Sequence, residues 1–386
     1  MFWINFLHLY QPANIEKEKV VEATKKSYER ILRGLEEHPE IKFTLNISGC
    51  LLARWDEEFH YNELIDRIGK LIKKGQIELV GSVAFHALLP LVSLAEIKNQ
   101  IIENENIIKK YFGNIKLKGF FFPEMAFDEK TAKIVKQMGY EWIIVDEIAL
   151  GKLGLVDKNK FYIDRSSGLK IIFRDRSISE SYVPETLLRL IKEEKIDLAI
   201  TASDAELYGL RHIDHSADFE KLLKNKSLKT LTISNYLKFK SFAKVKLFAC
   251  SWQSTEKELY MNKPFALWQN NGIIHRKLWH LADLAQSLNL KNVKDENYYW
   301  SRWHLVRGLA SCVFWWASGK DFRKVFGPIA WNPDEIEKGI NELVRSIRTL
   351  ENSTDLKTKL EAEKLALDIK KLIWRKHWNY YGKHNS

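Results

Sequence analysis

The chain has 386 residues, of which 45% are hydrophobic, and carries a formal net charge of +11 at pH 7. This length can bury the core of a large α/β domain together with a smaller one, and its lysines are mixed with glutamates along helix faces, which argues against nucleic acid as a partner. No stretch reaches the ~20 apolar residues of a membrane span, and the first residues form a strand pattern without a leader, so we expect a soluble, cytoplasmic protein with no membrane partner.

Strand and helix patterns alternate through the first two thirds of the chain. Repeated units of strand and crossover helix predict a parallel sheet, and seven or eight such units usually close into a barrel, with a doubly wound open sheet as the alternative. Strands are predicted at residues 2–9, 42–48, 77–81, 118–122, 142–145, 170–173 and 198–203, with an eighth or edge strand at 245–249.

Helix start signals lie between these strands. Asn62 is predicted to cap one helix, Ser93 and Glu96 form a capping box for the next, and Pro184 opens a later one. Strand signals stop after about residue 255. We therefore predict a barrel over residues 1–255 and a helical domain over 256–386. Its helices are predicted at 273–288, 298–316, from 333 onward, and at 356–374.

The predicted helical domain holds most of the tryptophans. Most of them are expected in its core, but aromatic faces commonly grip sugars, so some are candidates for substrate contact. The candidates that we select are Trp268, Trp315 and Trp316.

Glu124 interrupts an otherwise apolar run. Residues 118–122 have the pattern of a buried strand, and Pro123, which cannot donate to a sheet ladder, ends it. Glu124 therefore follows the carboxyl end of a parallel strand, where α/β barrels place their ligands. A helix cap is the structural alternative for this acid, and a nucleophile or acid/base is the functional one.

Acids also follow three further predicted strands. Converging strand ends would bring them to one rim of a closed barrel. Asp204 and Glu206 are two residues apart, so on an extended segment both would face the pocket, and their repulsion would raise one pKa, which suits a proton donor. A nucleophilic carboxylate and an acid/base carboxylate are the equipment for retaining glycoside hydrolysis. The acids at the other strand ends are Asp146, Glu147 and Asp175.

Four motifs appear in order along the chain: His8-Leu-Tyr-Gln11-Pro12, Gly75-Gln-Ile-Glu78-Leu-Val-Gly81, Phe122-Pro-Glu124 and Asp204-Ala-Glu206-Leu-Tyr-Gly209. Each is weak alone, but together with this spacing they resemble glycoside hydrolase family 57. That family of α-amylases, 4-α-glucanotransferases and branching enzymes is built on an incomplete (β/α)7 barrel with appended helices.

The resemblance implies that residues 1–255 form a catalytic (β/α)7-type barrel and that the helical domain over 256–386 completes the active-site cleft. It also implies roles for individual residues. Glu124 would be the nucleophile and Asp204 the general acid/base. The positions that match sugar-binding residues are His8, Gln11, Glu78 and Glu206, and His86 just past a strand end is a further pocket candidate.

Two positions depart from the family pattern. The first motif usually carries a second histidine where this chain has Tyr10, and the fifth often has an Asp where this chain has Cys312. These departures concern subsite contacts and substrate choice, and they leave the catalytic pair in place.

Two alternative functions remain open. A metal-dependent polysaccharide deacetylase could use a related barrel, with His212, His215 and Asp204 as ligands. A non-catalytic carbohydrate-binding homologue would keep the fold and lose turnover.

We predict a retaining α-glycosidase acting on an α-glucan or maltooligosaccharide, as a monomer or homodimer. Neither a cofactor nor a metal is expected, and the three cysteines, far apart and without a CxxC pair, are typical of a reducing cytoplasm. The sequence does not choose between hydrolysis and transglycosylation, nor does it fix linkage or chain length.

Overall fold

The computed structural model describes residues 1–238, 241–319, 330–351 and 354–384. The chain divides into two compact units, of which the first comprises residues 1–84 and 98–261 and the second residues 85–97 and 262–386.

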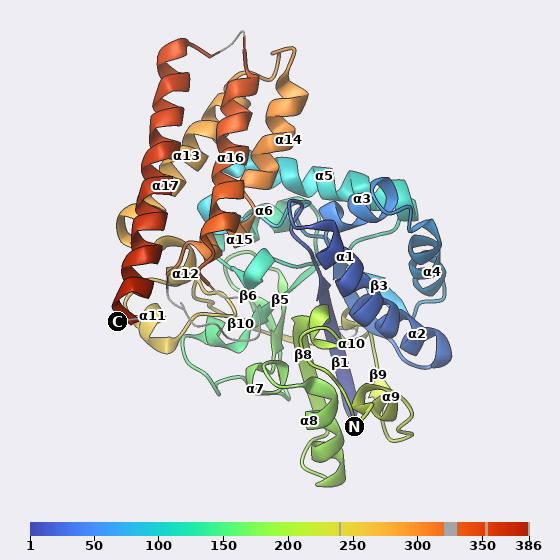
Figure 1. The fold of residues 1–386 in the computed structure, drawn as a ribbon. Coiled ribbons are helices and arrows are strands. Elements are labelled where there is room, and N and C mark those ends of the chain that lie inside the picture. The colour runs from blue at the N-terminus through green and yellow to red at the C-terminus, as the bar shows by residue number, and fades with distance from the viewer. Residues whose placement is uncertain (239–240, 320–329, 352–353, 385–386) are drawn as a thin grey trace. The chain divides into compact units, whose positions relative to one another are not determined.

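Seven parallel strands, all within the described residues, form the wall of the first unit (Figure 1). Hydrogen-bonded ladders run in the order β3-β2-β1-β8 and, for the second sheet, from β7 through β5 to β4. The bounds are β1 Phe2–Leu9, β2 Phe43–Ile47, β3 Ile77–Leu79, β4 Gly119–Phe120, β5 Trp142–Asp146, β7 Lys170–Arg174 and β8 Leu198–Asp204.

Contacts at two seams join these ladders into a ring. Gly81 and Phe120 form a parallel bridge between the ends of β3 and β4. At the opposite seam the Asp175 amide donates to the Ile200 carbonyl at 2.7 Å, which links β7 to β8. The predicted incomplete (β/α)7 barrel is thereby confirmed. Gly119 is required at the first seam, because a Cβ there would lie 2.1 Å from the Trp142 ring.

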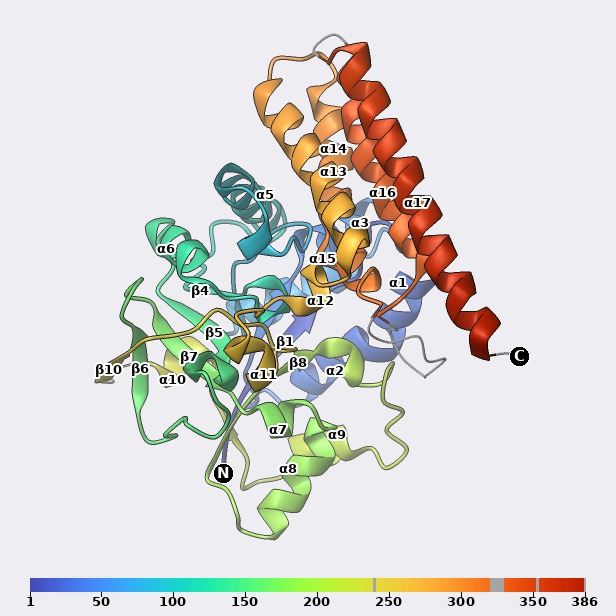
Figure 2. The same cartoon turned by 90° about the vertical axis from the view of Figure 1, so that its left-hand side faces the viewer.

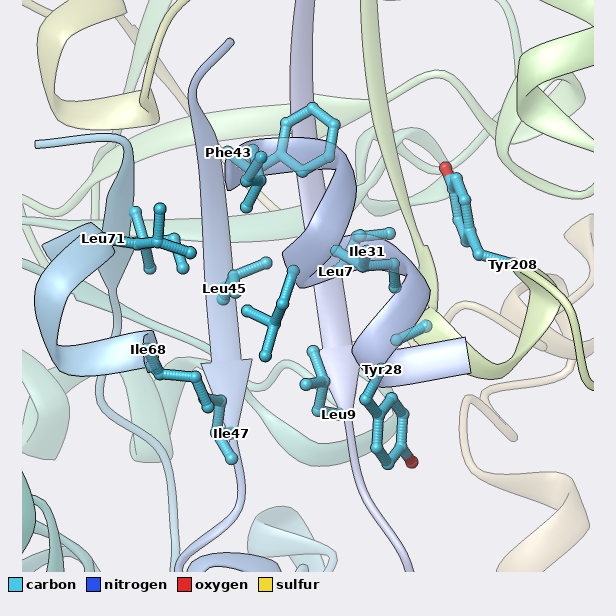
Figure 3. Close-up of a cluster of buried hydrophobic side chains, with 14 of the residues drawn as sticks. Leu7, Leu9, Tyr28, Ile31, Phe43, Leu45, Ile47, Ile68, Leu71 and Tyr208 are labelled. Atoms are coloured by element: carbon cyan, nitrogen blue, oxygen red, sulfur yellow. The ribbon is translucent and has the colours of Figure 1, made fainter. Parts of the chain in front are cut away.

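Side chains alternate between the inside and the outside of this ring, as the period of a strand requires. Ile4 and Phe6 of β1 belong to an inner apolar cluster that includes Ile233 of α10 (Ile233–Tyr236). Leu7 and Leu9 point to the outer layer, where they meet Tyr28 and Ile31 (Figure 3). The burial of both faces explains why the strands read as continuous apolar runs.

Helices and short turns connect the strands. The helix predicted from Asn62 does begin there, but Tyr61 occupies the N-cap position and the Asn62 side chain does not cap it. The bounds are α1 Lys17–Ala23, a π-helical turn Thr24–Tyr28, α2 Glu29–Glu37, α3 Gly49–Glu57, α4 Asn62–Lys73, α5 Leu94–Phe112, α6 Glu129–Gln137, α7 Arg176–Ser179, α8 Val183–Lys192, α9 Asp218–Leu223 and α11 Glu256–Tyr260.

Three short strands lie outside the predicted set. β6 (Phe161–Asp164) runs antiparallel to β7, β10 (Phe242–Val245) pairs with β6 as an edge, and β9 (Lys229–Thr230) pairs with the start of β1. The edge strand expected at 245–249 is observed as β10 at 242–245, so it lies three to four residues earlier than predicted.

The second unit is helical, and its long helices α13, α16 and α17 run alongside one another (Figure 2). The helix predicted over 298–316 is broken, because Ala310 is extended and forms a bridge with Ala87. The bounds are α12 Ala266–Gln269, α13 Gly272–Lys291, α14 Tyr298–Gly308, α15 Ser311–Trp316, α16 Pro333–Thr349 and α17 Leu356–His384. Within the described part of the chain, every helix is too short or too polar to cross a bilayer.

Candidate active site

Glu124 lies in a tight turn that begins three residues after the end of β4. The turn Pro123–Met125 is a single 3₁₀ turn in which Glu124 has φ 60° and Met125 has φ 47°. Two consecutive non-glycine residues in the left-handed region cost roughly 1–3 kcal/mol each, so the surrounding structure must impose them. Such backbone strain is concentrated at functional sites, and here it sets the direction of the Glu124 side chain.

A segment from 128 residues further along the chain holds this turn. The Trp252 indole Nε1 donates to Glu124 Oε2 at 2.9 Å, and the Trp252 amide donates to the Glu124 carbonyl at 3.1 Å. Phe127 and Cys250 exchange backbone hydrogen bonds at 2.8 and 3.1 Å in an antiparallel bridge. Trp252 therefore fixes both the backbone and the carboxylate of Glu124.

A buried ionic cluster supports Trp252. The Arg174 guanidinium lies 5.4 Å from the Trp252 ring centre and donates to the Trp252 carbonyl at 3.3 Å. Asp146, which is fully buried, accepts from Arg174 at 2.6 Å and from Arg176 at 2.9 Å. The acid predicted at the end of β5 is thus a structural anchor.

His8 and Asp204 lie at the same level of the barrel. Backbone register aligns His8 of β1 with Asp204 of β8 and with Asn46 of β2. His8 Nδ1 donates to Asn46 Oδ1 at 2.8 Å. Burial lowers the pKa of His8 to about 4, against the opposing effect of the nearby Asp204 charge. His8 is therefore neutral near pH 7.

Asp204 remains accessible at the end of β8. Its side chain is 24% exposed and accepts a hydrogen bond from Arg211 Nη1 at 2.6 Å. Arg211 follows the fourth motif by two residues and is a close cation to this acid.

Glu206 has a different environment from that expected. The segment after Asp204 is a 3₁₀ turn, Ala205–Leu207, so the two acids do not share an extended strand. Glu206 is buried, where it accepts hydrogen bonds from Tyr28 and, at 2.8 Å, from Gln11. Burial, assisted by the Asp204 charge, raises the pKa of Glu206 well above the ordinary value. Glu206 and Gln11 therefore form an internal network beneath the rim.

Three aromatic contacts connect the surroundings of Glu124 to those of Asp204. The Trp252 ring lies edge-on to the His8 ring with centres 6.5 Å apart, and Phe121 contacts both rings at 4.7 and 6.1 Å. Glu124 and Asp204 thus lie at the same end of the barrel, with Trp252 and His8 between them. That these two acids act together on one sugar stays a prediction.

Glu78 lies deeper than the other candidates. It is aligned with Thr44, two residues before Asn46, which places it about 7 Å below the level of His8. Its carboxylate accepts from the Ser234 amide at 3.0 Å and from Thr44 at 3.2 Å, and burial raises its pKa. These contacts do not support the expectation that Glu78 holds sugar hydroxyls beside the cleavage point.

The remaining candidates belong to the second unit. His86 is buried with φ 59°, and its Nδ1 lies 2.9 Å from Ser311 Oγ. Trp268 is 1% exposed and is a core residue, which does not support a substrate contact. Trp315 and Trp316 are partly exposed on α15 and stay candidates.

The two departures from the family pattern lie in different surroundings. The Tyr10 ring stacks on His8 with centres 5.7 Å apart, and Cys312 is buried in α15. The histidines of the deacetylase alternative do not join Asp204: His212 stacks on Tyr182, and His215 is exposed. Over the described ranges no three His, Cys, Asp or Glu side chains gather in a way that could hold a metal ion.

Three residues of this site were missed by sequence reasoning: Tyr28, Arg211 and Trp252. Tyr28 could have been sought in the helix after the first motif, where a π-helical turn at 24–28 presents it to Glu206. No local signal marks Trp252, whose role depends on a contact between distant segments.

Comparison with known proteins identifies relatives for most of this unit. The family profile described as glycosyl hydrolase family 57 matches residues 5–249. An α-amylase of Pyrococcus horikoshii is 26% identical over 234 residues, which are 56% of this chain and 36% of that protein. A 4-α-glucanotransferase of Thermococcus litoralis is 24% identical over 261 residues, 61% of this chain and 38% of that protein. The chain therefore spans little more than a third of these curated relatives.

Solved structures share the fold. A family 57 branching enzyme of Thermococcus kodakaraensis has a TM-score of 0.70 at 15% identity, covering 95% of this chain and 94% of that one. The 4-α-glucanotransferase structure of Thermococcus litoralis has a TM-score of 0.69 at 18% identity, covering 90% of this chain and 60% of that one.

Proposed function

Because the chain belongs to glycosyl hydrolase family 57, we propose that it is a retaining α-glycosidase that hydrolyses α-glucans or transfers their glycosyl units. The observation that carries the proposal is the pair of acids at one barrel end, Glu124 and Asp204, each held by its own donor, Trp252 and Arg211.

The reaction proceeds in two displacements. Glu124 attacks the anomeric carbon while the bond to the leaving oxygen breaks and Asp204 gives that oxygen its proton. In the second step Asp204 takes a proton from water or from a sugar hydroxyl, whose oxygen attacks the anomeric carbon and releases Glu124. The two inversions restore the original configuration.

The surroundings of the two acids suit these roles. The hydrogen bond from Trp252 uses one carboxylate oxygen of Glu124 and orients the group, as positioning of a nucleophile requires. Asp204 is 24% exposed, which allows contact with a leaving oxygen and later with an acceptor. His8, with its Nδ1 proton committed to Asn46, borders the same space as a neutral side chain that suits sugar hydroxyls.

The names of the relatives support α-glucans as the substrate class, since they include α-amylases and 4-α-glucanotransferases. Hydrolysis and transfer differ in whether water is excluded from the acceptor side. The proposed location is the cytoplasm, because Cys50, Cys250 and Cys312 are buried free thiols.

Product analysis tests the substrate and the acceptor. Incubation with maltooligosaccharides should give either longer and shorter oligosaccharides, which indicate transfer, or reducing-end release without longer products, which indicates hydrolysis. An unchanged pattern with maltooligosaccharides and amylose would refute the substrate class.

Azide rescue tests the two roles separately. With an α-glycosyl fluoride, Glu124→Ala plus azide should yield the β-glycosyl azide, because azide replaces the nucleophile in a single inversion. Asp204→Ala plus azide should yield the α-glycosyl azide after two inversions. Equal activity of both variants and the parent would overturn the assignment.

A further inference from the structure

A cavity of about 580 Å³ lies beside the barrel wall in the first unit, and Glu124, Asp204 and His8 are not among its lining residues. Its walls come from β6, β7 and β8, the loop after β5, and Tyr236 of α10. A volume of this size is in the range of small-molecule sites in proteins.

The seam between β7 and β8 explains why a cavity forms here. β6 pairs antiparallel with the first half of β7, through Lys170 and Ile171. β8 meets β7 beyond that pairing, where Asp175 donates to Ile200. The two partners of β7 therefore diverge, and side chains of Ile172 and Ile200 from the facing strands line the resulting gap.

The cationic side chains that line this seam cavity, Lys158, Lys160, Arg174 and Arg176, are each paired with a carboxylate. Lys158 binds Asp175 at 2.7 Å and Lys160 binds Asp157 at 3.0 Å. Arg174 and Arg176 both bind Asp146. A phosphate or carboxylate ligand would have to displace one of these carboxylates, which disfavours an anionic ligand.

The rest of the cavity surface is amphipathic. Phe161, Tyr162 and Tyr236 are partly exposed aromatic residues, and at the cavity edge Ser177 supplies an exposed hydroxyl and Glu180 an exposed carboxylate. A sugar ring combines an apolar C–H face, which packs on aromatic rings, with hydroxyls that bind such polar groups.

We propose that the seam cavity is a second carbohydrate site that takes a neutral oligosaccharide and is separate from the site around Glu124 and Asp204. Arg174 belongs to the cavity wall and also packs on Trp252, which binds Glu124. A ligand in the cavity therefore contacts a residue that supports the turn of Glu124.

Calorimetric titration with maltotriose tests this site. Glu124→Gln should bind two equivalents, because the substitution stops turnover and keeps the shape of the carboxyl group. Adding Ser177→Trp, which places a large ring at the edge of the cavity, should remove one equivalent. The matched control, Lys226→Trp at an exposed residue outside the cavity lining, should keep both.

The outcomes separate the second site from the proposed function. A single equivalent that Ser177→Trp abolishes would support the cavity while refuting glucan binding around Glu124. One equivalent that survives Ser177→Trp, no binding at all, or two equivalents in the Ser177→Trp protein would overturn the cavity proposal. Hydrogen exchange gives a second measurement: maltotriose should protect amides of residues 153–162 and 171–177, and unchanged exchange there would also overturn it.

Discussion

The indole N–H of Trp252 donates to the carboxylate of Glu124 at 2.9 Å, and the backbone amide of Trp252 binds the carbonyl of the same residue at 3.1 Å. One residue thus binds both the side-chain carboxylate and the backbone carbonyl of the proposed nucleophile. Because Glu124 is in the left-handed region, these bonds help offset a conformation that the isolated turn would avoid.

Trp252→Phe should lower kcat with little change in KM. The phenyl ring keeps an aromatic surface for Arg174 and His8 but cannot donate to Glu124. A hydrogen bond to a charged group contributes about 1.5–3 kcal/mol, so kcat should fall about 10- to 100-fold. Steady-state kinetics on a maltooligosaccharide measure the change.

Gln253→Ala is the control for this variant, because Gln253 is the exposed neighbour of Trp252. It should leave kcat unchanged. Equal kcat for Trp252→Phe and the parent protein would show that the indole N–H does not position Glu124.

Asp146→Ala should destabilise the first unit strongly. The Asp146 carboxylate is fully buried between Arg174 and Arg176, and its removal leaves two guanidinium groups without their main anionic partner. Breaking a buried ion pair in this way costs about 3–5 kcal/mol. Urea denaturation measures the loss, and Asp157→Ala, at an exposed ion pair, should change the free energy of unfolding far less. Similar losses for both variants would contradict the anchoring role.

The stability advantage of the Glu206→Gln variant over the parent protein should grow as pH rises. The pKa of Glu206 is raised by burial, so the parent protein must ionise a buried acid, and its stability falls as pH rises from about 4.5 through the folded-state pKa. Glutamine has no such ionisation, and its side-chain oxygen can still accept from Tyr28 and Gln11. Melting temperatures from pH 5 to 9 should diverge in favour of the variant. Parallel curves would contradict the shifted pKa.

Lowering the pH should reduce the stability of the parent protein more than it reduces the stability of the His8→Gln variant. Burial lowers the pKa of His8 from 6.5 to about 4, so the unfolded imidazole takes up a proton more readily than the folded one. The stability due to neutral His8 is complete above pH 6.5 and is lost as pH falls towards 4, with a total on the order of 3 kcal/mol. Denaturation at pH 7 and 4.5 measures this loss, and an equal loss in the variant would rule out His8 as its source.

The buried strands were predictable because burial on both faces leaves a direct trace in composition. The seven predicted barrel strands all form, although β4 ends at Phe120, two residues before its predicted end, and Glu124 follows it in the turn Pro123–Met125. The short strands β6 and β9 were missed, and β10 was predicted three residues too late, since none of them has the long apolar run of the barrel strands. The break at Ala310 was missed because it depends on pairing with Ala87.

The sequence by itself determined where the barrel strands lie along the chain and which of them are followed by an acid. Both are local patterns that extend over a few residues. Only the tertiary structure decided which acids are accessible, which are buried and what holds them. Asp204 and Glu206 are two residues apart, yet one is partly exposed and the other is enclosed by Tyr28 and Gln11. Desolvation and hydrogen-bond partners come from segments distant in the chain, and a local pattern carries no information about them.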